Sequence, residues 1–184
     1  MMGRQAFAAS FNIFYRIGFG MMGLSTPQLY IQIAPQTLTG RVIGQSTTLY
    51  EAADIAIAHH DQGMRVVRAA GNAASLMRGS ANVQMHSPFA HPRVVVHEPE
   101  IAQALLQWFT KQALGGGWLI KRRPDMVLHP VRMLEGGLTV LEVQSLKAIA
   151  RAAGARNVHI WTGRTLQDHE VGLAPQPLPQ GRWH

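Results

Sequence analysis

The stretch RPDMVLHPV (123–131), followed by GGLTVLEVQSLKAIARAAGARNVHI (136–160), decides the fold. DMVLHPV at 125–131 and NVHIW at 157–161 are short apolar runs typical of buried strands. Between them, TVLEVQSLKAIARAAG at 139–154 has the apolar period of a helix that ends near Gly154. We expect this helix to bury Val140 or Leu141, Val143, Leu146 and Ile149 or Ala150. The order strand, helix, strand predicts parallel strands joined by a crossover helix.

The same alternation begins upstream. RVVVH at 93–97 is expected to form a strand, and PEIAQALLQWFTKQAL at 99–114 a helix with Pro99 in its first turn. The glycines at 115–117 end this helix. Its predicted buried side consists of Ile101, Leu105, Trp108 and Phe109.

The region between residues 24 and 92 has a different sequence pattern. Its short β-rich runs are separated by Pro35, Gly40, Gly44 and a turn at 61–63. We expect strands joined mostly as hairpins, then a short helix at 71–77 and an extended piece at 83–85. The expected strands are LYIQI (29–33), TGRVIG (39–44), ADIAIA (53–58) and MRVVRAA (64–70).

Composition limits the classes of function. The 184 residues are 47% hydrophobic and 15% charged, which predicts one folded domain rather than a disordered chain. Cysteine is absent, which excludes disulfides, thiolate metal sites and cysteine nucleophiles. The net charge of +7 favours anionic partners such as nucleic acid or the inner leaflet of a membrane.

The first 23 residues predict an amphipathic helix, because phenylalanines recur at spacings of three and four and the first acidic residue is Glu51. An arginine in the middle makes lying in a membrane interface easier than spanning the bilayer. The alternative to membrane binding is that the phenylalanines pack on the core of the domain or on a partner. A third interpretation is that this segment is a mitochondrial transit peptide. The candidate membrane-binding residues are Phe7, Phe11, Phe14, Arg16 and Ile17.

Other candidate sites are less specific. The nine histidines match no zinc spacing, so no metal site is predicted, and we interpret them as surface or strand residues. The glycines at 115–117 lack the lysine and hydroxyl residue of a phosphate-binding loop, and no catalytic residue or cofactor is predicted. The helix at 139–154 is too mildly basic to make nucleic-acid binding the leading hypothesis.

Together, residues 24–172 resemble the first domain of the MreB-type bacterial actins. The best matches are RPDMVLHPV, a G-x-T-x-x-E helix start at Gly137, Thr139 and Glu142, and an A-G-A-R-x-V helix end at 153–158. VVVHEPEIAQALLQWF and AAGNAASLMRG are weaker matches. The resemblance implies an RNase H-like α/β domain, with antiparallel hairpins, then parallel strands and flanking helices, preceded by the N-terminal amphipathic helix.

The departures from the family lie at its phosphate loop, I-D-L-G-T, which corresponds here to residues 31–35. Gln32 replaces the aspartate and cannot supply its negative charge. Ala34 adds a side chain where the glycine lets phosphate approach, and Pro35 removes a backbone donor. The resemblance also stops before the second phosphate loop. Glu142, at the position of the family's hydrolytic glutamate, is therefore interpreted as an acidic residue that favours a helix N-terminus.

The resemblance implies a non-catalytic scaffold protein, cytoplasmic and peripheral on the inner membrane, that assembles with itself, with a filament or with a membrane complex. The alternatives are an accessory subunit of an envelope or secretion complex and a nucleic-acid-binding protein, with a residual ATPase last. The expected organisation is a membrane- or partner-binding helix at 1–23, an actin-like domain at 24–172 and a proline-rich extended tail at 173–184.

Overall fold

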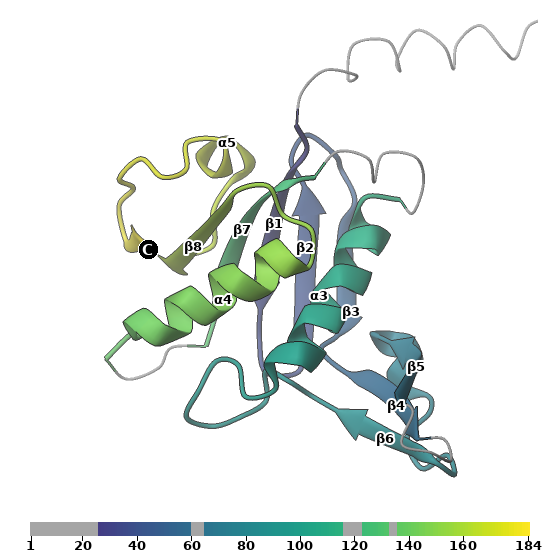
Figure 1. Ribbon diagram of the computed structural model, residues 1–184. Coiled ribbons are helices and arrows are strands. Elements are labelled where there is room, and N and C mark those ends of the chain that lie inside the picture. The colour runs from purple at the N-terminus through teal and green to yellow at the C-terminus, as the bar shows by residue number, and fades with distance from the viewer. Residues whose placement is uncertain (1–25, 60–64, 116–122, 133–135) are drawn as a thin grey trace, which may run out of the picture.

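The computed structural model describes residues 26–59, 65–115, 123–132 and 136–184, so the helix predicted at 1–23 lies outside the described residues (Figure 1). The main sheet has six strands in the order β3-β2-β1-β7-β8-β9. Strands β1, β7 and β8 are parallel, and the other neighbours are antiparallel. The strands are β1 (Gln28–Ile33), β2 (Thr37–Val42), β3 (Thr48–Ala52), β7 (Asp125–Pro130), β8 (Val158–Gly163) and β9 (Gly181–Trp183).

Alternation along the strands divides the core between the two faces of this sheet. In β1, Leu29 and Ile31 point into the larger cluster, whereas Tyr30 points into a smaller cluster on the other face. Helices α3 (Pro99–Ala113) and α4 (Val140–Ala152) pack against each other and supply the helical side of the larger cluster (Figure 1). The mixed sheet with flanking helices confirms the predicted fold class.

Helix α4 has well-defined ends. The Thr139 hydroxyl accepts a hydrogen bond from the Glu142 backbone N–H, and the Glu142 carboxylate accepts one from the Thr139 N–H, which forms a capping box. The helix ends before Gly154, whose φ of 112° suits a residue without a side chain. Both boundaries agree with the helix predicted at 139–154.

A second, smaller sheet has the order β5-β4-β6 and consists of β4 (Ile55–His59), β5 (Arg65–Ala70) and β6 (Val83–His86). The short helix α2 (Asn72–Ser75) packs against it. Buried Asp54 precedes β4 and accepts hydrogen bonds from the side chains of Ser75, Arg78 and Ser87. These bonds join α2, the turn after it and the residue after β6 around the start of the small sheet.

The strand expected at 93–97 is wrong, because this segment is irregular. Its backbone bonds to loops and a side chain: the N–H of Val95 donates to Glu142 and the N–H of His97 donates to the carbonyl of Pro88. Strand β7 already pairs with β1 and β8 on its two sides. The valines here serve as core side chains, with Val95 buried.

Two further expectations are corrected. Val140 and Leu141 are 72% and 76% exposed, so neither is buried by α4, whereas Leu146, Ile149 and Ala150 are. Segment 173–184, expected as a tail outside the domain, returns to the main sheet as β9. The reason is local packing, because Trp183 of β9 lies against the fully buried Trp161 with ring centroids 4.8 Å apart.

Candidate functional site at the carboxyl edge of the main sheet

The parallel strands β1, β7 and β8 end at one edge of the main sheet, which we call the carboxyl edge. In open α/β sheets, ligands bind outside this end of the strands. The edge contains the turn after β1, the residues after β7 and the start of α4, and it is therefore where the residues singled out in the sequence meet.

The end of β1 and the turn at 33–37 hold the three residues predicted to disable phosphate binding, Gln32, Ala34 and Pro35. The backbone N–H of Ala34 donates to the carbonyl of Thr37 at 2.9 Å, and Pro35 has no N–H to offer. The Gln32 amide donates to the Thr165 hydroxyl at 3.0 Å. A phosphate cradle needs backbone N–H groups aimed at the ligand, and this turn bonds the Ala34 donor internally.

Glu142 lies at the start of α4, as the resemblance implies, but its carboxylate already has partners. One oxygen accepts hydrogen bonds from the N–H and the hydroxyl of Thr139, at 2.9 and 2.8 Å, and the other accepts from the N–H of Val95 at 3.3 Å. Burial favours a higher pKa for Glu142, but the hydrogen bonds outweigh it, and the pKa is lowered. The carboxylate is held as an ionised cap, not poised as a base near neutral pH.

A buried hydrogen-bond chain fastens the ends of β7 and β8. His129 Nε2 lies 3.0 Å from the carbonyl oxygen of Gly163, which accepts only, so this nitrogen carries the proton. His129 Nδ1 therefore accepts from the Tyr30 hydroxyl at 2.6 Å. The same hydroxyl accepts from the N–H of Leu166 at 3.2 Å. The chain thus links β1, β7, β8 and the segment after β8.

Removing the hydroxyl with Tyr30→Phe should lower the free energy of unfolding by about 1–3 kcal/mol, because His129 Nδ1 and the Leu166 N–H lose their partner in the interior. Urea denaturation followed by circular dichroism measures the change. Tyr50→Phe is the matched control, since the Tyr50 side chain is 68% exposed. Equal losses in the two variants would contradict the hydrogen-bond chain.

The stability of the domain should fall as the pH drops below 6.5. Burial lowers the pKa of His129, His159 and His184 below the ordinary value of 6.5, so the fold favours their neutral forms. The unfolded chain then binds more protons below that value, and stability present above pH 6.5 is lost on acidification. Melting temperatures between pH 8 and 5 measure this slope. His129→Gln should flatten it and His59→Gln, at an exposed strand end, should not; identical slopes would refute the explanation.

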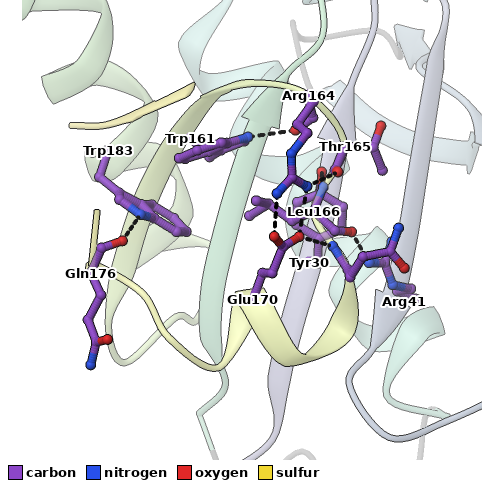
Figure 2. A network of polar contacts seen from close by, with 10 residues as sticks. Tyr30, Arg41, Trp161, Arg164, Thr165, Leu166, Glu170, Gln176 and Trp183 are labelled. Carbon is purple, nitrogen blue, oxygen red and sulfur yellow. Dashed lines mark hydrogen bonds and ion pairs between the residues drawn. The ribbon is translucent and has the colours of Figure 1, made fainter. Parts of the chain in front are cut away.

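Residues 164–184, the C-terminal segment, cover the second face of the main sheet (Figure 2). Arg164 forms a two-pronged ion pair with Glu170, one contact being 2.8 Å, and the same carboxylate accepts from the N–H of Gln167. The hydrogen bonds from Arg164 and Gln167 lower the pKa of Glu170 to about 2. This carboxylate is therefore ionised at neutral pH.

Arg41 of β2 ties the C-terminal segment to the hairpin (Figure 2). Its guanidinium donates to the Asp168 carboxylate at 2.6 Å and to the carbonyl of Leu166 at 2.5 Å, and it lies over the Tyr30 ring, 4.6 Å from the centroid. Helix α5 (Asp168–Val171) is positioned by these contacts. These contacts hold the C-terminal segment against the hairpin.

Two adjoining hollows mark the carboxyl edge. The first is lined mainly by apolar residues from the turn after β1 and from the irregular segment, and the second lies between the start of α4 and the ends of β8 and β9. Pro130 and Arg132, which follow β7, line both. We call the two together the edge groove.

Within the described ranges there is no cluster of three histidine or acidic side chains that could hold a metal ion. His86 and His97 instead both lie beside the Glu98 carboxylate, at 2.7 and 3.5 Å. Nor does the described part of the chain contain a helix long and apolar enough to cross a membrane. The five candidate membrane-binding residues between 7 and 17 lie outside the described residues.

Sequence reasoning missed Arg41, His129 and the whole C-terminal segment. The signal at His129 was a histidine inside an otherwise apolar strand, which indicates a buried, hydrogen-bonded side chain. No local signal exists for Arg41, whose partners Leu166 and Asp168 are more than 120 positions away. Gln32, Ala34, Pro35 and Glu142 all lie at the carboxyl edge.

A three-strand meander, two parallel strands with a crossover helix and a small second sheet define an actin-like fold. The chain is similar to MreB5 of Spiroplasma citri bound to AMPPNP, with 24% identity and a TM-score of 0.56, covering 74% of this chain and 38% of MreB5. It is also similar to a non-polymerising mutant of MamK bound to AMPPNP, with 13% identity, a TM-score of 0.57 and coverage of 74% and 40%.

A MamK double helical filament is a further neighbour, with 14% identity, a TM-score of 0.53 and coverage of 72% of this chain and 40% of MamK. No family model matches the sequence, and no curated protein matches it either. At these identities the likeness establishes the fold. The chain spans about two fifths of the length of the MreB5 and MamK chains.

Proposed function

We infer that this chain is a non-catalytic structural protein of the actin-like fold, which assembles with copies of itself or with an actin-like filament at the inner membrane. The observation that carries the non-catalytic part is the turn after β1. Its Ala34 N–H is bonded within the turn, Pro35 offers none, and Gln32 brings no charge for a metal ion.

The position of Glu142 supports the same inference. A hydrolytic glutamate needs an oxygen that can orient or deprotonate a water molecule. Both oxygens of Glu142 accept protein hydrogen bonds, and its pKa is lowered. The fold supports the structural part, because one of its neighbours is a double helical filament.

Sedimentation tests the assembly. The purified full-length chain is centrifuged with and without vesicles containing anionic lipid, in low and high salt, with magnesium and ATP present or absent. We expect concentration-dependent pelleting that is insensitive to ATP, and filaments or sheets by electron microscopy. A chain that stays in solution under every condition, alone and with an actin-like filament, would contradict the proposal.

Membrane attachment is tested in the same assay by removing residues 1–23. Vesicle binding should be lost with this deletion and with the triple change of Phe7, Phe11 and Phe14 to serine. Arg16→Gln should weaken it only in low salt, because the arginine contributes electrostatic attraction that salt screens. Vesicle binding without self-assembly would favour an accessory subunit of an envelope complex.

A further inference from the structure

The edge groove is a concave feature of the carboxyl edge, and its lining residues come from segments far apart in the sequence. Its second hollow lies between Leu138, just before α4, and Thr162 and Gly163 at the end of β8, and it is closed by Gly181 and Arg182 of β9. The strand β9 is thus part of the wall. The groove therefore depends on the C-terminal segment, which is itself held by buried polar contacts.

Large exposed apolar side chains lie close in sequence to the residues that line this groove. Val140 and Leu141, two and three positions after Leu138, are 72% and 76% exposed, and Val131, beside Arg132, is 38% exposed. Both α4 residues occupy the first turn of the helix, where polar residues would serve equally well for helix formation. Exposed apolar side chains that follow the lining of a concave surface are typical of a binding site.

The charge of the groove is positive. Arg132 and Arg182 line it, and within the described residues neither guanidinium takes part in an ion pair. Neither hollow is lined by an aspartate or glutamate of the described residues, and the two oxygens of nearby Glu142 are occupied by Thr139 and Val95. A ligand in the groove therefore meets apolar surface between two exposed cations, of which Arg132 also donates a hydrogen bond to the carbonyl of His91 at 3.4 Å.

This charge argues against a second copy as the occupant. The other large exposed apolar side chains in the described residues include Val67 of β5 and Leu76 after α2. Arg65 and Arg68 flank Val67 in sequence, and Arg78 follows Leu76, so that surface is basic as well. Bringing two arginine-bearing surfaces together is unfavourable.

We propose that the edge groove binds a segment of a partner protein in which apolar side chains are flanked by aspartate or glutamate. The apolar anchors lie along Leu138, Val140 and Leu141, and carboxylates of the partner pair with Arg132 and Arg182. This inference rests on the proposed non-catalytic function, because a carboxyl edge occupied by a protein segment is not open to a nucleotide.

The probe is a phage-displayed library of random 16-residue peptides, selected on the immobilised full-length chain. The enriched peptides are synthesised with a fluorescent label and titrated by anisotropy against four variants. Two alter the groove, V140S/L141S and R132E/R182E. The controls are L76S and R68E, which change an exposed leucine and an arginine in the small-sheet region. All four changes affect exposed side chains, so melting temperatures close to that of the unaltered chain verify folding.

We expect enriched peptides that combine Leu, Ile or Phe with Asp or Glu, bind at least tenfold more weakly to both groove variants, and bind the controls unchanged. Affinity should fall with salt for the unaltered chain and much less for R132E/R182E. Three results would overturn the proposal. The enriched peptides could lack acidic residues, or they could bind the groove variants as tightly as the unaltered chain. The third result is that V140S/L141S abolishes dimer formation or binding to anionic vesicles.

The proposed function can fail separately, because nucleotide binding is measured on the same preparations without peptide. Magnesium-dependent ATP binding would remove the non-catalytic function whether or not peptides bind. Absence of both activities would remove only the inference about the groove.

Discussion

Trp161→Ala should lower the free energy of unfolding by about 3–5 kcal/mol, the range for removing a fully buried aromatic side chain. Trp161 is completely buried in β8, and its ring lies against Trp183 of β9. Its indole N–H donates to the carbonyl of Arg164 at 2.7 Å, at the start of the C-terminal segment (Figure 2). The substitution therefore removes both the core of the smaller cluster and the surface on which β9 packs.

Chemical denaturation monitored by far-ultraviolet circular dichroism measures this effect. Trp183→Ala serves as a comparison. Its side chain is half-buried, so we expect a smaller loss of unfolding free energy, together with faster amide hydrogen exchange in 181–184. Gly181→Ala should also destabilise the packing of β9, because a methyl group at this position would lie 2.0 Å from the Trp161 ring. An unaltered stability of Trp161→Ala would show that the C-terminal segment does not pack as described.

Gly71→Ala should destabilise the domain by roughly 3 kcal/mol, the sum of backbone strain and overpacking. Gly71 precedes α2 with a φ of 67°, a region that side-chain-bearing residues rarely adopt. An added Cβ would lie 2.3 Å from the Glu51 carboxylate and 2.4 Å from the Trp108 ring of α3. The Glu51 carboxylate accepts a hydrogen bond from the N–H of Asn72 at 2.7 Å, so the clash breaks a contact between β3 of the main sheet and α2.

Gly79→Ala separates the two costs. Gly79 has a φ of 86°, but nothing lies within 4 Å of the position where its Cβ would be. This control should therefore lose only the backbone strain of about 1–2 kcal/mol. The difference between the two variants, measured by thermal denaturation, reports the close approach of Trp108. Equal losses in both variants would contradict that approach.

The regular elements of the core were predictable because their signals are local. The apolar period of 139–154 and Gly154 at its end specify α4, and the β-rich run before it specifies β7. Alternation in 29–33 specifies β1 and places Tyr30 on the face opposite Leu29 and Ile31. The family resemblance added how these elements are ordered in the sheet, which periodicity alone does not contain.

The C-terminal segment could not be predicted because its contacts are long-range. Its prolines suppress any regular period, and what returns the chain to the sheet is Trp183 stacking on Trp161. Gly163 and Gly181 allow this approach, since a Cβ at Gly163 would lie 2.4 Å from the carbonyl oxygen of Gln180. None of these relations is visible as spacing in the sequence.

Two errors come from the same physical source. The β-branched valines at 94–96 were predicted to form a strand because of their residue type. Val140 and Leu141 were predicted to include a buried residue because both are strongly hydrophobic. Apolar character states only that burial is favourable. Which side chains are covered depends on the packing of the other elements, and at the edge groove none of the described residues covers Val140 and Leu141.

Isothermal titration of the full-length chain with ATP and AMPPNP, with and without magnesium, tests the central claim most directly. The claim is that the turn of Gln32, Ala34 and Pro35 provides no cradle for a metal-bound triphosphate. The account predicts no saturable heat at protein concentrations of tens of micromolar. Saturable, magnesium-dependent binding with a micromolar Kd would contradict it.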